Sequence, residues 1–138
     1  MIVLDTNVVS ELMRPGANPA VLAWVDQHRS DQVYLTAVTT AELRYGVARL
    51  PHGRRRAELT QQLQQIIEAD FAGRVHPFDD EAARHYAEIV AHREGRGLPI
   101  SMADGQIAAI CRSTGARLAT RNTKDFTDTG IDAVNPWA

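Results

Sequence analysis

The sequence predicts an α/β fold, a three-layer α/β/α sandwich with a central parallel sheet. Short apolar runs of strand length alternate with longer segments of helical periodicity through nearly the whole chain. Single Gly and Pro residues separate these segments, and no linker, repeat or low-complexity tract interrupts them. Because parallel neighbouring strands need a crossover, which is usually a helix, this alternation favours a parallel sheet with helices on both faces.

The N-terminal half of the chain is expected to contain two strands and four helices. An apolar run that stops at Asp5 predicts the first strand, and Asn18 followed by Pro19 is typical of a helix start. Apolar residues recur at helical spacing after Arg54, which predicts an amphipathic helix. The expected strands are 1–4 and 32–36, and the expected helices begin at about residue 6 and cover 18–28, 40–50 and 54–70.

The C-terminal half is expected to continue the alternation. Asp79 and Asp80 are suited to capping a helix, Ser101 to starting the next one, and Gly115 to ending it. The expected strands are 75–78, 116–120 and about 133–134, and the expected helices run from 80 to 95–97 and from 101 to 115.

Length and composition fit one domain over residues 1–138. The chain is 44% hydrophobic and 23% charged, close to the averages for globular proteins, and its net charge is -2. The single cysteine, Cys111, lies in an apolar run and is expected to be buried. We find no signal-peptide pattern and no apolar stretch that could span a bilayer, so we expect a cytoplasmic protein that contacts no membrane.

Three carboxylates follow strands at the edge where a parallel sheet usually binds its ligand. Asp5 comes directly after the first strand, and Glu42 and Asp104 fall early in later helices. Magnesium prefers carboxylate oxygens, keeps several waters and takes phosphate oxygens as further ligands. Converging acids would repel one another without a cation or a shared proton, so the sequence favours a divalent metal site.

A structural interpretation of the same acids stays open at this point. Glu42 lies three residues after Thr39, and Asp104 lies three residues after Ser101. This spacing is typical of a capping box. Asp5 could likewise cap the first helix, because acidic side chains are favoured at helix starts.

Four segments resemble the motifs of the PIN-domain family, and especially its VapC-type toxins from bacterial toxin–antitoxin pairs. Residues 2–11, with Asp5, Thr6 and Asn7, resemble the opening motif. Residues 40–46, 103–109 and 119–126 resemble the second, third and fourth motifs, in the family's order. The resemblance extends from Met1 to Trp137 and so covers essentially the whole chain.

The resemblance implies a Mg²⁺- or Mn²⁺-dependent endoribonuclease with Asp5, Glu42 and Asp104 as catalytic and metal-binding residues. In this chemistry the bound metal activates water and neutralises charge on the phosphate. For the fourth acidic position the choice between Asn122 and Asp125 stays open, since some members have an acid where this chain has Asn122. The residues that could position ligands or water are Thr6, Asn7, Thr120, Asn122 and Asp125.

The resemblance also implies partners: RNA as substrate, a VapB-like antitoxin, a homodimer within a toxin–antitoxin hetero-oligomer, and DNA only through the antitoxin. The densest basic stretch includes Arg44, Arg54, Arg55 and Arg56, which could contact RNA or the antitoxin. A solvated helix face is the alternative interpretation of such a run.

Two other functions remain open from the sequence. One is a catalytically weak PIN-fold binding module that binds DNA with its antitoxin as an autorepressing complex, because an amide at residue 122 would weaken a second metal site. The other is a metal-assisted hydrolase of a small phosphoester, because carboxylate sites do not by themselves specify a substrate.

Overall fold

A five-stranded, entirely parallel sheet forms the centre of the molecule, as the sequence predicts. The computed structural model describes all residues from 1 to 138. Neighbouring strands follow the order β3-β2-β1-β4-β5. The strands are β1 (Ile2–Leu4), β2 (Val33–Thr36), β3 (Val75–His76), β4 (Arg117–Ala119) and β5 (Ala133–Val134).

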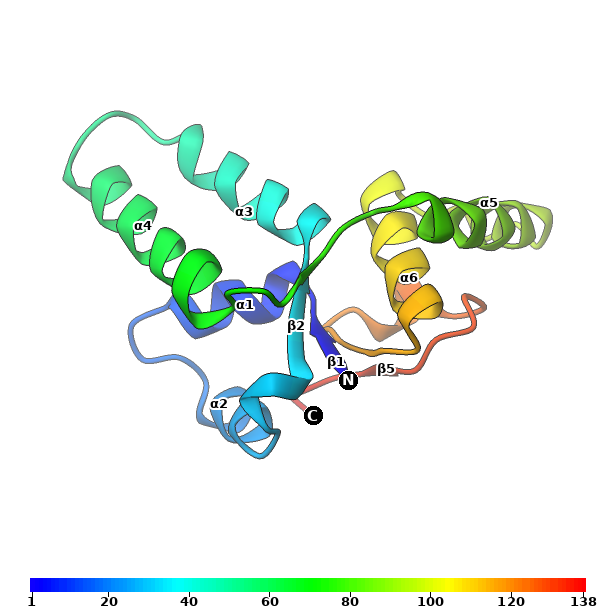
Figure 1. Cartoon of the computed structure of the whole chain (residues 1–138), viewed down its shortest axis with the longest axis horizontal. Helices are drawn as coiled ribbons and strands as arrows, with labels where there is room; N and C mark the ends of the chain where they lie inside the picture. The colour runs from blue at the N-terminus through cyan, green and yellow to red at the C-terminus, as the bar shows by residue number, and fades with distance from the viewer.

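Helices cover both faces of this sheet and form two hydrophobic cores. The helices are α1 (Thr6–Met13), α2 (Pro19–Asp26), α3 (Ala37–Ala48), α4 (Arg54–Gln64), α5 (Asp80–Gly95) and α6 (Met102–Thr114). Figure 1 shows α1 to α4 on one side of β1 and β2, and α5 and α6 on the other. Along β1 the side chains alternate between the two cores: Leu4 packs with the first group of helices and Val3 with the second. None of the helices has both the length and the apolar character needed to span a membrane.

Local signals in the sequence explain where most helices begin and end. The side chains of Asp5, Asn18, Asp79 and Ser101 each accept a hydrogen bond from a backbone N–H of the helix that follows. Gly115 ends α6 with φ of 73°, a left-handed conformation that glycine adopts without strain. These caps confirm the helix starts that the sequence predicts near residues 6, 18, 80 and 101.

Three predicted boundaries are wrong. Helix α3 begins at Ala37 and not near residue 40, because the Thr36 hydroxyl at the end of β2 caps it by accepting from the Thr39 amide at 3.1 Å. Strand β3 stops at His76, because its partner β2 ends at Thr36 and the next residue, Pro77, has no N–H to donate. The helix predicted over 54–70 is α-helical only to Gln64, and residues 65–70 form a π-helix.

Cys111 is fully buried in α6, as the sequence predicts. Burial, together with the negative charge of Asp5, raises the pKa of its thiol to about 12. The thiol is therefore protonated at neutral pH and serves as a small apolar side chain in the core.

Gly105 allows α6 to pack closely against α5. A Cβ at this position would lie 2.9 Å from Tyr86 Cε2 and 3.2 Å from Val90 Cγ2. We expect Gly105→Ala to lower the free energy of unfolding by about 1–3 kcal/mol, the usual cost of overpacking. Chemical denaturation would measure this loss.

The matched control is Gly46→Ala, at a helical glycine whose added Cβ would meet nothing within 4 Å. It should stabilise the chain by about 0.5–1 kcal/mol, because alanine is the better helix former. Equal effects of the two substitutions would contradict close α5–α6 packing at Gly105.

Candidate active site

The candidate site lies where the direction of chain travel through the sheet reverses. From the central strand β1 the chain adds β2 and β3 on one side, and later β4 and β5 on the other. Ligands of open parallel sheets bind beyond the carboxyl ends of the strands at such a point. Asp5 follows β1 there, and Thr120 follows β4.

Asp5 is held by hydrogen bonds to both of its carboxylate oxygens. Its side chain is buried, and Oδ1 accepts from the Thr6 amide at 2.8 Å as the N-cap of α1. Oδ2 accepts from the Thr120 hydroxyl at 2.7 Å and from Asn7 Nδ2 at 3.4 Å. Asp5 therefore caps the helix with Oδ1, while Oδ2 is held by Thr120 and Asn7 beyond the strand ends, so the two interpretations of this acid are compatible.

Glu42 does not belong to a capping box. Because α3 starts at Ala37, Glu42 lies within the helix and not three residues after its cap. Its Oε1 accepts a hydrogen bond of 2.6 Å from the Thr6 hydroxyl. This bond joins α3 to the start of α1, which places Glu42 beside the residue that follows Asp5.

Asp104 lies in the first turn of α6, half-buried, with its amide donating to the Ser101 hydroxyl at 3.1 Å. This bond confirms Ser101 as the N-cap that the sequence predicts. The charges of Asp5 and Glu42 act on the Asp104 carboxylate, so it lies near both of these acids.

Burial and neighbouring negative charges raise the pKa of two of the three acids, Asp5 and Asp104. Burial raises the pKa of Asp5, and the charge of Glu42 raises it further, whereas the hydrogen bonds from Thr120, Thr6 and Asn7 oppose this rise. Burial also raises the pKa of Asp104, followed by the charge of Asp5 and, more weakly, that of Glu42, against the hydrogen bond with Ser101. A cation between these carboxylates would relieve their repulsion and stabilise the ionised forms.

The donor set suits a hard divalent cation that keeps part of its water shell. No three His, Cys, Asp or Glu side chains are grouped tightly enough to hold one ion between them. Magnesium, however, usually takes only one or two carboxylates, with waters and substrate phosphates as its other ligands. Asp5 and Asp104, whose pKa is raised by the charge of Asp5, meet that requirement, with Glu42 near enough to contribute.

The auxiliary residues surround Asp5 and Asp104 to different degrees. Asn7 links the carboxylate of Asp5 to the segment after β4. Its Nδ2 donates to Asp5, and its Oδ1 accepts from the Arg121 amide at 3.2 Å. Asn122 enters the network through its backbone amide, which donates to the Thr120 hydroxyl at 3.1 Å. Asp125 acts at longer range, since its charge contributes to the raised pKa of Asp104.

Thr39, expected from the sequence only as a possible helix cap, also belongs to this network. It is fully buried, and its hydroxyl donates to the Thr6 hydroxyl at 3.3 Å, because the single proton of Thr6 is used in the bond to Glu42. Thr39 lies in the first turn of α3, whereas the predicted helix start at residue 40 placed it outside the helix.

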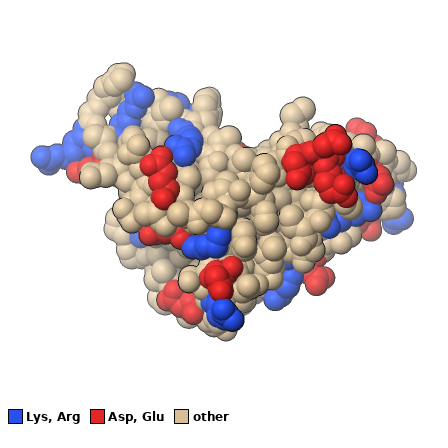
Figure 2. All heavy atoms as spheres, viewed as in Figure 1, with Lys and Arg blue, Asp and Glu red and all other residues tan.

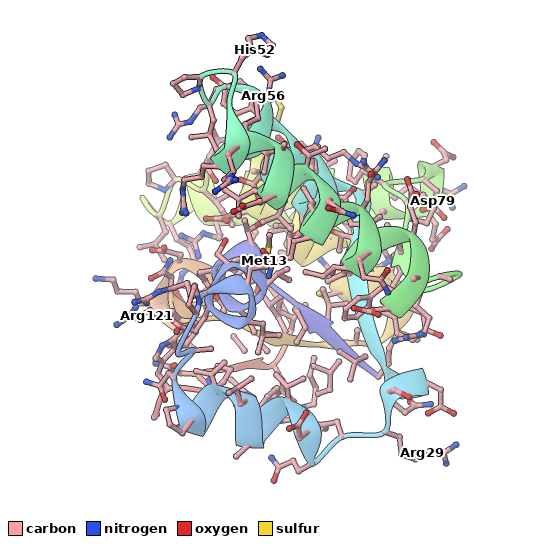
Figure 3. All side chains as sticks on the ribbon, turned by 90° about the vertical axis from the view of Figure 1, so that its left-hand side faces the viewer. Met13, Arg29, His52, Arg56, Asp79 and Arg121 are labelled. Atoms are coloured by element: carbon pink, nitrogen blue, oxygen red, sulfur yellow. The ribbon has the colours of Figure 1, made fainter.

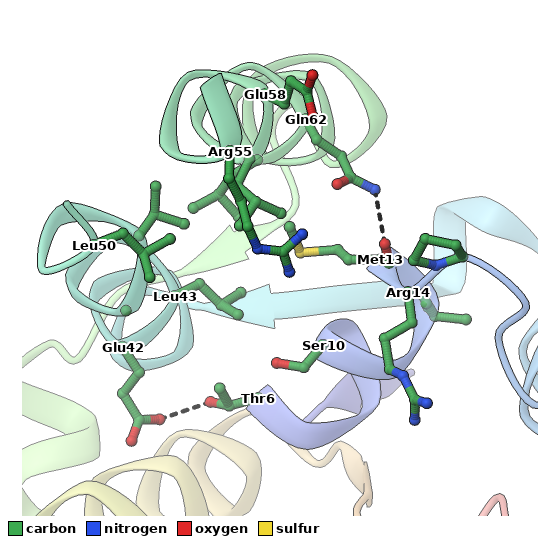
Figure 4. A pocket seen from close by; sticks show the side chains of 16 residues that line it. Thr6, Ser10, Met13, Arg14, Glu42, Leu43, Leu50, Arg55, Glu58 and Gln62 are labelled. Carbon is green, nitrogen blue, oxygen red and sulfur yellow. Dashed lines mark hydrogen bonds between the residues drawn. The ribbon is translucent and has the colours of Figure 1, made fainter. Parts of the chain in front are cut away.

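A groove between α1, α3 and α4 runs up to the acidic site. Its volume is about 690 Å³, and seven of its 16 lining residues are hydrophobic. Figure 4 shows Thr6 and Glu42 at one end of this groove, with Arg55 reaching in from α4. An elongated ligand in the groove would therefore contact the acidic site with one end.

The structure divides the basic stretch among different surfaces. Arg55 lines the groove, whereas Arg44 and Arg56 line a separate hollow of about 230 Å³. Arg54 is highly exposed and makes a 4.0 Å ion pair with Glu58. Blue side chains gather near the tip of the α3–α4 hairpin in Figure 2, and Figure 3 shows His52 and Arg56 at that tip.

Comparison with known proteins identifies relatives over the whole length of the chain. Residues 2–131 match the model of the PIN domain family. The chain is 46% identical to the VapC ribonuclease Y4jK of Sinorhizobium fredii, covering 99% of this chain and 98% of that protein. It is 44% identical to Toxin FitB of Neisseria gonorrhoeae, covering 99% of each. A chain in the solved structure of FitAB bound to an IR36 DNA fragment superposes with a TM-score of 0.94, at 43% identity over 100% of this chain and 96% of that one.

Proposed function

Because the chain belongs to the PIN domain family, we propose that it is the endoribonuclease toxin of a VapC-type toxin–antitoxin pair. The observation that carries this proposal is the acidic crevice beyond β1, where the charge of Glu42 raises the pKa of Asp5 and the charge of Asp5 raises the pKa of Asp104. Relatives named ribonuclease and toxin, at 46% and 44% identity over nearly the full chain, support the same activity.

Asp5 and Asp104 would hold a divalent metal, Mg²⁺ or Mn²⁺, with Glu42 completing the acidic site. When bound, such a metal supplies a Lewis acid that lowers the pKa of water and neutralises charge on a phosphodiester. The hydroxyl of Thr120 and the amide of Asn7 fix the orientation of the Asp5 carboxylate by hydrogen bonding to Oδ2.

Glu42 is suited to orienting the attacking water. Oε1 is already engaged by the Thr6 hydroxyl, which leaves Oε2 free to accept a hydrogen bond from water. Since Glu42 is exposed, it can do this at the surface where a long RNA strand would pass.

The partner we propose for the groove is an antitoxin segment with apolar side chains. The groove is lined by Leu12, Leu43, Val47, Leu50, Leu59 and Leu63 among others, which favours apolar contacts. Because Thr6 and Glu42 line its end, a segment bound there would cover part of the acidic site and block RNA. The FitAB structure supports a partner of this kind, and its DNA supports contact with DNA through the antitoxin.

The experiment that tests the proposed function is cleavage of a mixed pool of structured RNAs by the purified chain, with Mg²⁺, with Mn²⁺ and with a chelator. We expect cleavage with either metal and none with the chelator, because ionised Asp5 and Asp104 without a cation repel each other and the phosphate. Restoring metal after chelation should restore cleavage. Metal-independent cleavage, or metal binding with no cleavage of any RNA, would overturn the proposal.

A further inference from the structure

Arg93 is a buried cation without an acidic partner. It lies in the last turn of α5 with only 5% of its surface exposed. None of the ion pairs in the structure includes it. A buried charge is costly unless its hydrogen-bonding groups are satisfied, so the contacts of this guanidinium need an explanation.

The guanidinium donates to four backbone carbonyls in two separate segments. Nε donates to Leu98 O at 2.9 Å and Nη2 to Pro99 O at 3.4 Å. Nη1 donates to Asp125 O at 3.0 Å and to Thr127 O at 2.6 Å. One side chain thus joins the α5–α6 loop to the segment that follows β4.

Each of these two segments carries an acid of the candidate site. Leu98 and Pro99 lie just before Ser101, the cap of the helix that presents Asp104. The second segment contains Asp125 itself, in a 3₁₀-helix over Thr123–Phe126. Asp104 and Asp125 are 21 positions apart in sequence, so only tertiary contacts can fix the distance between their two segments.

From this geometry we infer that Arg93 is a positioning residue, which fixes the start of α6, and with it Asp104, against the segment that contains Asp125. The inference rests on the proposed metal-dependent function and adds one residue to it.

The charge of Asp125 contributes to raising the pKa of Asp104, which agrees with the segment held by Arg93 lying near this acid. A second anchor acts on the same segment, because Thr129 is buried and its hydroxyl donates to Phe126 O at 2.5 Å.

Lysine cannot replace this arginine. A guanidinium has five N–H donors in a planar fork. Arg93 uses four of them to reach four carbonyls in two segments. An ammonium is a compact group with three donors and could reach only some of them. Arg93→Lys therefore keeps the charge but loosens one segment from the other.

The test compares Arg93→Lys with the wild-type chain in two measurements that do not use RNA. Isothermal titration with Mn²⁺ should show about 10-fold weaker binding, the usual effect of losing a group that orients metal ligands. Hydrogen exchange of the metal-free chain should become faster in residues 98–104 and 122–127 together. The matched control, Arg112→Lys, alters a half-buried arginine that donates to Glu88 at 2.8 Å, and it should leave both measurements unchanged.

A double-variant comparison then asks whether Arg93 acts through Asp104. Asp104→Asn should weaken Mn²⁺ binding by at least about 10-fold on its own, and adding Arg93→Lys should weaken it no further. Losses that multiply in the double variant, or an Arg93→Lys chain with unchanged binding and exchange, would overturn the inference. A wild-type chain that binds Mn²⁺ but cleaves no RNA would overturn the proposed function alone. If the wild-type chain bound no Mn²⁺, the proposed metal site would fail, and exchange confined to one of the two segments would reject the role of Arg93 as well.

Discussion

Asp104→Asn should reduce metal-dependent RNA cleavage by at least about 100-fold, because a metal that stabilises charge on the phosphate contributes several kcal/mol and each 1.4 kcal/mol is a factor of ten in rate. The substitution keeps the shape of the side chain and removes the negative charge that would hold the metal together with Asp5. Initial cleavage rates at saturating Mn²⁺ would measure the loss.

The matched control is Asp26→Asn, the same substitution at an exposed aspartate at the end of α2, and it should cleave at the wild-type rate. Full activity of the Asp104→Asn chain would reject Asp104 as a ligand.

Thermal melting separates a lost ligand from a lost fold. The raised pKa of Asp104 means that the folded chain holds this proton more tightly than the unfolded chain does. Its ionisation therefore lowers stability as the pH rises from its usual pKa of 3.8 through the raised value. Without metal, the Asp104→Asn chain should thus melt at a higher temperature than the wild type at neutral pH, and Mn²⁺ should stabilise the wild type more.

Leu59→Asp should weaken antitoxin binding by about 30-fold or more, since a central apolar contact typically contributes at least about 2 kcal/mol to an interface. Leu59 is half-buried in the wall of the groove, and an aspartate there would place a charge against the antitoxin's apolar side chains. Titration with a VapB-like antitoxin that binds the wild-type chain would give the dissociation constant, and the antitoxin concentration that halves RNA cleavage should rise in parallel.

The control for this substitution is Leu22→Asp, on the exposed face of α2 and outside the groove. It should bind the antitoxin as the wild type does. If both variants bound equally well, the antitoxin would have to occupy another surface, and the groove would need a different ligand.

The parallel sheet and the location of the acids could be predicted from local patterns. Short apolar runs ending at Asp5 and near Thr120 marked the strand ends, and parallel strands bring their carboxyl ends to one edge. Ser101 and Gly115 also act through neighbours a few residues away, so their roles as helix start and helix end were visible in the sequence. The role of these acids as metal ligands stays a prediction.

The capping interpretation of Glu42 failed because two local signals competed. Thr36, Thr39 and Thr40 are all able to cap a helix, and the sequence does not rank them. The end of β2 determines where the helix starts, because it places the Thr36 hydroxyl where it accepts a hydrogen bond from the Thr39 amide. With the helix started earlier, the side chain of Glu42 meets Thr6 from another helix.

The sequence by itself determined the order of strands and helices along the chain, most of the helix caps and the set of acids near the strand ends. Each of these depends on residues close together in the chain. Only the tertiary structure decided which side chains meet: the Thr120 hydroxyl with Asp5, the Thr6 hydroxyl with Glu42, and Arg93 with two distant loops. Arg93 continues the apolar face of α5 formed by Ala82, Tyr86 and Ile89, a pattern that indicates burial but not a partner. Its partners are backbone carbonyls, which every residue carries, and only packing determines which of them come within reach of a buried guanidinium.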